Sequence, residues 1–210
     1  MKGLLLKDWY MALKYCRIYL LFSAIFIVAS VFDGDNLILL FYPCMLCGMI
    51  PVNLLGYDER SRWLTYCDAL PCTRTQFVCA KYLIGLLIQT TLALLTVTAQ
   101  GVRMGLAGSF ALSELLALML MLLAVATFSS SIALPFVFKL GAEKGRAGYY
   151  AMVGFVCAAV VIGSRLSLDP QQLQLPVRPG LLLGSITLVC VCIYALSWLL
   201  SIRFYQKREL

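Results

Sequence analysis

Side chains that could do chemistry gather in one charged segment, residues 58–81, which lies between two long apolar runs. The segment contains four basic and three acidic residues, and it begins with the adjacent carboxylates of Asp58 and Glu59. Charged groups of both signs outside the lipid suit the binding of a protein partner. The alternative is a solvated loop whose charges only fix the topology of the chain.

The spacing within this segment predicts two helices separated by a proline. The apolar side chains that recur at intervals of three and four are Trp63, Tyr66, Cys67 and Leu70. They predict a short amphipathic helix, which Pro71 ends because the residue before a proline is driven out of the helical region. Thr73 is then an N-cap with Gln76 at the third helical position, and Cys72 with Phe77 can form a hydrophobic staple.

Other motifs that could bind a ligand or catalyse a reaction are weak. The glycine cluster at residues 141–148 lacks the spacing and the Ser or Thr of a phosphate-binding loop. Cys44 and Cys47 form a C-x-x-C motif, but the chain has no histidine and both lie in an apolar run, so packing is favoured over metal or redox work. The sequence therefore predicts that the chain has no metal site and is not an enzyme. The alternative is a membrane enzyme that uses the cytoplasmic carboxylates.

The composition predicts the class of protein in which the charged segment, residues 58–81, is held. Of the 210 residues, 62% are hydrophobic and only 13% are charged, and the mean hydropathy is +0.90. A soluble domain has about half apolar and about a quarter charged residues. The chain is therefore predicted to be an all-α, polytopic membrane protein, and its length allows six transmembrane helices with short loops in a single domain, residues 1–210.

The first 17 residues predict an amphipathic helix that lies in the headgroup plane. Its expected apolar side consists of Leu5, Trp9, Ala12, Leu13 and Cys16, opposite Lys7 and Lys14. The six expected spans are Ile18–Phe32, Leu37–Tyr57, Tyr82–Val102, Leu115–Phe138, Ala147–Ser164 and Leu181–Ile202. Pro43 and Pro51 predict kinks in the second span.

Polar residues are few within these spans. Gln89, Thr96 and Gln100 share one face of the third span and either bind helices together or line a translocation route, and the first interpretation is favoured. No ionisable residue lies deep in any span, which argues against an ion-coupled carrier and a selective channel.

Charge predicts the orientation. Of the 17 Lys and Arg residues, 14 lie in segments on the side of the N-terminus. By the positive-inside rule both termini are cytoplasmic, in a multi-pass protein of the cell membrane, and residues 58–81 face the cytosol. The net charge of +7 thus reflects topology and does not indicate nucleic-acid binding.

Three short stretches carry a resemblance to a known family. Residues 58–60, 70–74 and 81–82 resemble the cytoplasmic loop of type-2 permeases of ATP-binding-cassette exporters, where an acidic pair precedes a Leu-Pro-x-Ser/Thr-Arg segment and a lysine. The opening Lys2-Gly3-Leu4 with Lys7-Asp8 looks like the small bacterial branch that exports phenol-soluble modulins and antimicrobial peptides. One departure is Arg62-Trp63, where many relatives carry Gly-Thr.

The resemblance implies a partner and a mechanism. Two permease chains, expected as a homodimer, would each dock on a separate ATPase subunit that binds ATP and Mg²⁺, and the loop between the second and third spans would supply the coupling helix. The residues expected to take part in this coupling are Asp58, Glu59, Arg60, Arg62, Trp63, Leu70, Pro71, Thr73, Arg74 and Lys81.

The expected function is ATP-driven export of amphipathic or hydrophobic peptides. Export of lipids or small antibiotics, self-protection against bacteriocins, and a membrane scaffold without transport are the alternatives.

Overall fold

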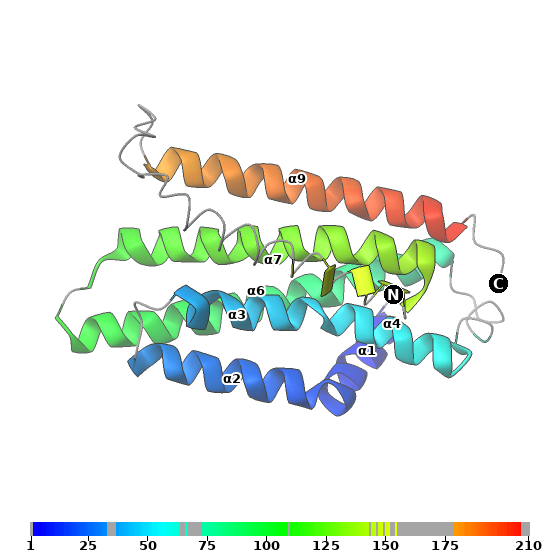
Figure 1. Cartoon of the computed structure of the whole chain (residues 1–210), viewed down its shortest axis with the longest axis horizontal. Coiled ribbons are helices and arrows are strands. Elements are labelled where there is room, and N and C mark those ends of the chain that lie inside the picture. Colours follow the sequence, from blue (N-terminus) through cyan, green and yellow to red (C-terminus); the bar gives the residue numbers. More distant parts are fainter. Residues whose placement is uncertain are drawn as a thin grey trace.

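Every regular element in the described part of the chain is an α-helix in the computed structural model (Figure 1). The structure describes residues 2–32, 37–63, 66, 73–108, 110–142, 144–145, 147–148, 150–151, 154 and 179–206. The helices are α1 (Lys2–Tyr15), α2 (Arg17–Phe32), α3 (Leu37–Gly48), α4 (Ile50–Arg60), α6 (Arg74–Leu106), α7 (Leu112–Leu140) and α9 (Pro179–Gln206). The prediction of an all-α chain is confirmed for these residues.

Several of these helices are long and apolar enough to cross a membrane. Four stretches meet this condition: Leu39–Arg60, Arg74–Leu106, Leu112–Leu140 and Leu183–Gln206. They correspond to the expected second, third, fourth and sixth spans. The bent pair of α1 and α2 makes at most one more, so the described helices give four or five of the six expected spans. Most of the expected fifth span, Ala147–Ser164, lies outside the described residues.

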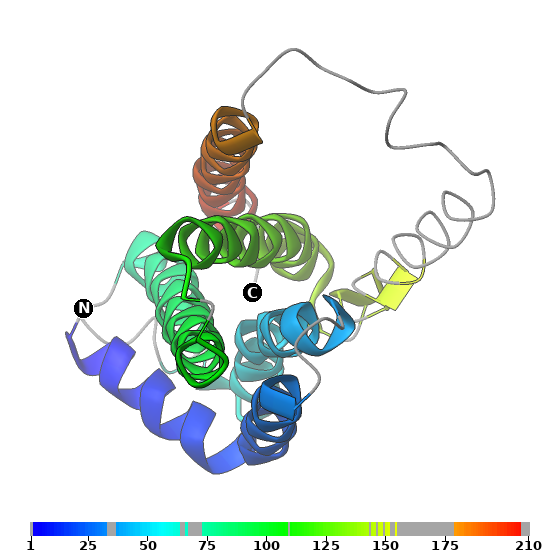
Figure 2. The same cartoon turned by 90° about the vertical axis from the view of Figure 1, so that its left-hand side faces the viewer.

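The N-terminal helices meet at an angle of 71° beside Cys16. With 16 residues, α2 is about 24 Å long, which is shorter than the hydrocarbon core of a bilayer at about 30 Å. Because of the 71° bend, the helix α1 turns aside from the bundle and crosses its end, as Figures 1 and 2 show.

The side of α1 that is buried within the chain overlaps only in part with the apolar side expected to lie against the headgroups. The structure buries Leu4, Asp8 and Ala12, whereas Trp9 and Leu13 are 42% and 44% exposed. Residues at spacings of four lie on one face of a helix, so Asp8 is at the centre of the buried face. A lysine of α6 neutralises this buried carboxylate.

The expected second span is interrupted once. Met49 is a turn between α3 and α4, and Pro51 occupies the first turn of α4, where its missing N–H costs least. Pro43 lies inside α3, which continues through it to Gly48. The helix is thus interrupted at Met49, two residues before Pro51, and it is not interrupted at Pro43.

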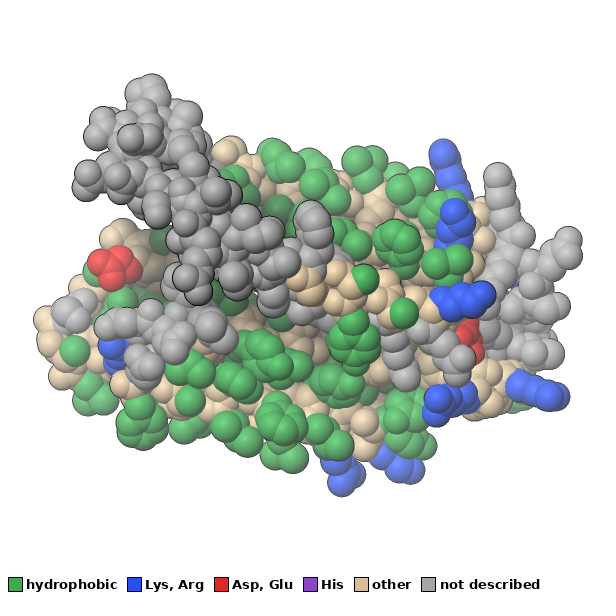
Figure 3. Space-filling model, viewed as in Figure 1, with side chains coloured by type: hydrophobic (Ala, Val, Ile, Leu, Met, Phe, Trp, Pro, Cys, Tyr) green, Lys and Arg blue, Asp and Glu red, His purple; other side chains and the backbone are tan. Residues whose placement is uncertain are grey.

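The arrangement places α6 and α7 in the middle of the bundle. In the end view of Figure 2, α9 packs on α7, while α2, α3 and α4 lie on the other side of α6 and α7. Apolar side chains cover the long face seen in Figure 3, and Lys and Arg side chains gather at one end of the molecule. A long apolar face with a basic end is the surface expected of a multi-pass membrane protein.

Candidate coupling site at the basic end of the bundle

Four charged side chains from three helices form a closed ring at the basic end. Lys81 Nζ on α6 lies 2.8 Å from Asp8 Oδ1 on α1 and 2.6 Å from Asp58 Oδ2 on α4. Lys7 Nζ closes the ring, 2.7 Å from Asp58 Oδ1 and 3.5 Å from Asp8 Oδ1. We call these four residues the charged ring.

The charged ring is almost completely removed from solvent. The side chain of Lys81 is 0% exposed, those of Asp8 and Asp58 are each 2% exposed, and that of Lys7 is 21% exposed. Two positive and two negative groups balance, so no member is an uncompensated buried charge. Such a ring fixes α4 and α6 in one arrangement, because separating either of them would leave a carboxylate or an ammonium unpaired. Separating α1 would break the bonds from Lys81 to Asp8 and from Lys7 to Asp58.

The capping box predicted at the start of α6 is confirmed. Thr73 Oγ1 accepts a hydrogen bond from the backbone N–H of Gln76 at 3.2 Å, and Gln76 Oε1 accepts one from the backbone N–H of Thr73 at 3.3 Å. The two bonds fix the residue at which α6 begins. They thereby place Lys81 two turns into the helix, opposite Asp58. Cys72, the other half of the expected staple, lies outside the described residues.

The segment that follows α4 is held by the same N-terminal helix. Lys7 Nζ lies 4.3 Å from the centre of the Trp63 ring, a distance typical of a cation–π interaction. The rings of Trp63 and Tyr66 are 5.3 Å apart. Lys7 therefore contacts both the last turn of α4, through Asp58, and the aromatic residue beyond it.

The two adjacent carboxylates at the end of α4 have different partners. Asp58 belongs to the charged ring, whereas Glu59 Oε2 accepts a hydrogen bond from the backbone N–H of Ala142 at 2.9 Å. Ala142 follows Gly141, the C-cap residue of α7, which has a φ of +88°. The last turn of α4 is thus bound to α1, to α6 and to the end of α7.

Tyr82, the residue after Lys81, binds the other side of the bundle. Its hydroxyl lies 2.9 Å from Ser197 Oγ and 2.7 Å from Ser201 Oγ, both on α9. Its ring stacks on that of Trp198 at 5.5 Å, and the Tyr194 hydroxyl donates to its backbone carbonyl at 2.9 Å. The start of α6 is therefore fixed to α9 by hydrogen bonds and ring packing, as it is fixed to α1 and α4 by charge.

The structure separates the predicted coupling residues into a surface group and a buried pair. Arg60, Arg62 and Thr73 are exposed, and three others are partly exposed: Glu59, Trp63 and Arg74. Asp58 and Lys81 are buried and form an ion pair with each other inside the chain. Leu70 and Pro71 lie outside the described residues.

Sequence reasoning missed three residues of the site, namely Lys7 and Asp8 of the charged ring and Tyr82. Asp8 carried a usable signal, because it lies four residues after Leu4 and four before Ala12, on a face that is otherwise apolar. A carboxylate in that position predicts a buried cation from another helix. Tyr82 carried no comparable signal, since a tyrosine at the start of a span is typical of a membrane interface.

The polar side chains of α6 connect helices. Gln89 Nε2 donates to Ser130 Oγ on α7 at 2.7 Å, and Gln100 Nε2 donates to the carbonyl of Ser30 on α2 at 2.9 Å. Thr96, between them in the sequence, is also buried. These bonds are the interhelical packing that was the favoured interpretation of the stripe.

The C-x-x-C cysteines are packed in the apolar interior. Cys44 and Cys47 are fully buried free thiols, and Cys47 Sγ lies 3.1 Å from Ser23 Oγ on α2. In the part of the chain that the structure describes, no three His, Cys, Asp or Glu residues come together as metal ligands.

Comparison with known proteins agrees with this architecture. A family model described as ABC-2 family transporter protein matches residues 3–206, almost the whole chain. No curated protein and no solved structure matches it.

Proposed function

The chain belongs to the ABC-2 family of transporters, and from this membership we propose that it is the permease subunit of an ATP-driven exporter whose ATPase is a separate chain. ATP and Mg²⁺ are bound by that ATPase, and two copies of the permease assemble with two copies of it. Both termini and the coupling segment face the cytosol, as the distribution of Lys and Arg predicts.

The charged ring is the observation that carries the coupling proposal. Arg62 is exposed and Arg74 is partly exposed in the segment between α4 and α6, where an ATPase can bind them. Directly behind them, Asp58 and Lys81 bind α4 and α6 to each other and to α1. A displacement of the surface residues therefore reaches the buried helices through ion pairs rather than through a flexible loop.

The cargo is an amphipathic or hydrophobic peptide. The resemblance to the small bacterial branch of peptide exporters supports this assignment, together with spans that lack deep ionisable groups. When the ATPase pair closes on ATP, the coupling segment moves, α6 tilts with it, and the route opens outward. Such a route has little charge to repel or trap an amphipathic helix.

Co-purification with the ATPase tests the partner. We expect the tagged chain to retain an ATPase that has both a phosphate-binding loop and a signature motif, encoded by a neighbouring reading frame. Arg74→Glu reverses the charge at the start of α6 and should lower ATPase retention and ATP hydrolysis by about tenfold or more, the size of an interface hot spot. Arg203→Glu is the matched control, because Arg203 is exposed at the same end of the molecule on α9.

Unchanged ATPase binding by the Arg74→Glu variant would contradict the docking surface, and transport by the chain without any ATPase would contradict the proposal as a whole.

The cargo is tested with vesicles that contain the permease and the ATPase. ATP-dependent movement of a labelled amphipathic helical peptide is expected. Movement of a labelled phospholipid and not of the peptide would show that the cargo assignment is wrong while the coupling holds.

A further inference from the structure

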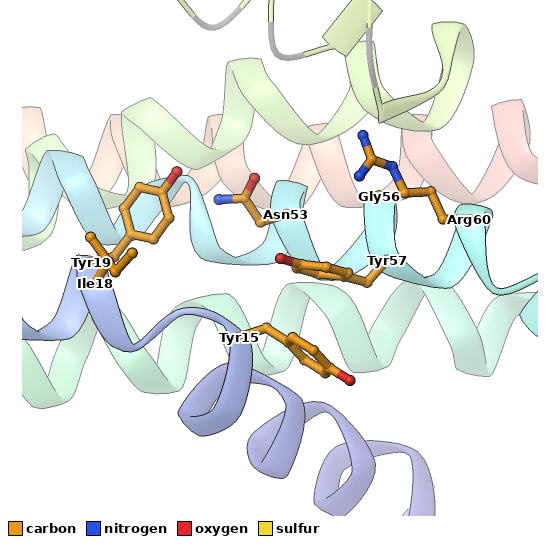
Figure 4. A pocket seen from close by; sticks show the side chains of 7 residues that line it. All are labelled: Tyr15, Ile18, Tyr19, Asn53, Gly56, Tyr57 and Arg60. Atoms are coloured by element: carbon orange, nitrogen blue, oxygen red, sulfur yellow. The ribbon is translucent and has the colours of Figure 1, made fainter.

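A cavity of about 290 Å³ lies between the bend that joins α1 to α2 and the outer face of α4 (Figure 4). Its polar lining consists of Tyr15, Tyr19, Asn53, Tyr57 and Arg60, and Ile18 adds an apolar edge. The volume is close to the lower limit of pockets for small molecules, about 300 Å³. It suits a single headgroup or a comparable polar group.

The lining is uniform in its hydrogen-bonding chemistry. Asn53, Tyr57 and Arg60 are spaced four and three apart, so they lie on one face of α4. In Figure 4 the hydroxyl of Tyr19 and the guanidinium of Arg60 lie on the same side of α4 as the Asn53 amide, while the Tyr15 ring packs against Tyr57. Amide, phenol and guanidinium groups all donate hydrogen bonds, and no carboxylate is among the described residues that line the cavity. Several hydrogen-bond donors together with the positive charge of Arg60 are suited to bind an oxyanion.

Asn53 provides a second and independent indication of a ligand. The residue is only 7% exposed, and its Nδ2 has no hydrogen-bond partner in the described part of the chain. Buried amides are otherwise nearly always satisfied, since an unpaired donor forfeits its bonds to water. An acceptor supplied from outside the chain would satisfy it.

The position of the cavity indicates where that acceptor comes from. It lies at the bend where α1 turns aside from the bundle, the level at which lipid headgroups meet the protein. Ile18 at its edge is 65% exposed, as expected of a side chain that faces acyl chains. Lys14 and Arg17, which directly precede the lining residues Tyr15 and Ile18 in the sequence, are exposed cations. A phosphate attached to a lipid reaches such a site along the membrane plane.

We propose that this cavity binds the phosphate of a membrane phospholipid, with the Asn53 amide and the Arg60 guanidinium as its main donors and the hydroxyls of Tyr19 and Tyr57 as supporting ones. The bound headgroup joins the α1–α2 bend to α4. Tyr57 directly precedes Asp58, so the lipid stabilises the same last turn of α4 that the charged ring holds. This inference depends on membership of a membrane-protein family and not on the identity of the ATPase or the cargo.

Native mass spectrometry of the purified, delipidated full chain tests the site. The probes are dioleoyl phosphatidylglycerol, dioleoylglycerol, which has the same acyl chains and no phosphate, and inorganic phosphate. We expect the phosphatidylglycerol to be retained and the dioleoylglycerol to be lost, and we expect inorganic phosphate not to displace the lipid. Displacement by inorganic phosphate would overturn the lipid assignment in favour of a free-phosphate site.

Two substitutions and a control locate the binding. Asn53→Asp keeps the shape of the side chain but replaces a donor with a negative group, and Arg60→Gln removes the cation. Each should weaken phosphatidylglycerol retention by about tenfold or more, the effect of losing a charge-assisted hydrogen bond. Arg203→Gln removes an exposed cation at the same end of the molecule, on α9, and should leave retention unchanged.

Arg60 is exposed, so its replacement keeps the test valid if the Asn53 variant fails to fold. Asn53→Leu distinguishes a ligand-binding role of Asn53 from a purely structural one, because the two roles predict different changes in stability. It removes the unpaired donor, so the lipid-free protein should unfold no more readily than the parent while phosphatidylglycerol binding falls. Unchanged retention in the Arg60→Gln variant, or an equal loss in the Arg203→Gln variant, would overturn the proposal.

Discussion

Replacing Lys81 with Met removes the central cation of the charged ring and keeps most of the volume of its side chain. Lys81 Nζ lies 2.8 Å from Asp8 and 2.6 Å from Asp58, and the side chain is fully buried. After the substitution two carboxylates share Lys7, which is 3.5 Å from Asp8. The region then carries one uncompensated negative charge in a place that water does not reach.

The expected cost is large relative to the stability of a protein. Removing one partner of a buried ion pair costs about 3–5 kcal/mol, against a total free energy of unfolding of about 5–15 kcal/mol. A second substitution restores neutrality: Asp8→Asn in the Lys81→Met background leaves Lys7 paired with Asp58 at 2.7 Å. The double variant should therefore recover about 1–3 kcal/mol, the usual coupling energy between residues in contact.

Reversible unfolding in mixed micelles by added dodecyl sulfate, followed by circular dichroism, measures these free energies. Lys14→Met is the matched control, because Lys14 is an exposed lysine on the same α1 that carries Asp8, and its loss should change stability by less than about 0.5 kcal/mol. The reasoning is refuted if Lys81→Met unfolds within about 1 kcal/mol of the parent. It is also refuted if the double variant is no more stable than Lys81→Met alone.

Two further predictions concern the start and the middle of α6 and use the same unfolding assay. Thr73→Ala removes the capping box and should cost about 1 kcal/mol, whereas Thr98→Ala, at an exposed position of the same helix, should be nearly neutral; equal effects would show that the cap contributes nothing. Gly85→Ala places a Cβ 2.8 Å from Pro51 Cγ, a rigid ring atom of α4, and should cost about 1–3 kcal/mol. Gly105→Ala meets nothing within 4 Å and should be neutral or slightly stabilising, so a loss of stability there as large as at Gly85 would contradict the packing argument.

Features that depend on neighbouring residues could be predicted from the sequence. The capping box at Thr73 requires only Gln76 three positions later, and the break beside Pro51 follows from the missing N–H of proline. The polar stripe of α6 was also predictable, because Gln89 and Gln100 have few options in an apolar bundle except to bond another helix. The residue types within one helix were enough to predict that these bonds form, although the partners of Gln89 and Gln100 on α7 and α2 were not predictable.

The charged ring could not be predicted in the same way. Asp8 and Lys81 are 73 positions apart, and Lys7 and Asp58 are 51 apart, so no local pattern joins them. A single ion is costly to bury, so charge alone favours a surface position, and that rule fails when four such groups meet and balance. Composition shows how many charges the chain has, but only the fold shows which of them share one interior site.

The adjacent positions of Lys81 and Tyr82 determine how a movement at the coupling segment is transmitted to the other helices. Lys81 and Tyr82 are consecutive, so their side chains leave α6 about 100° apart and reach different neighbours. Lys81 binds α1 and α4 through the charged ring, and Tyr82 binds α9 through Ser197 and Ser201. A rotation of α6 about its own axis would break one set of contacts, whereas a tilt about this junction keeps both. Because both sets are buried and satisfied, the junction favours a rigid tilt in which α1, α4, α6 and α9 keep their contacts at the basic end while their opposite ends move.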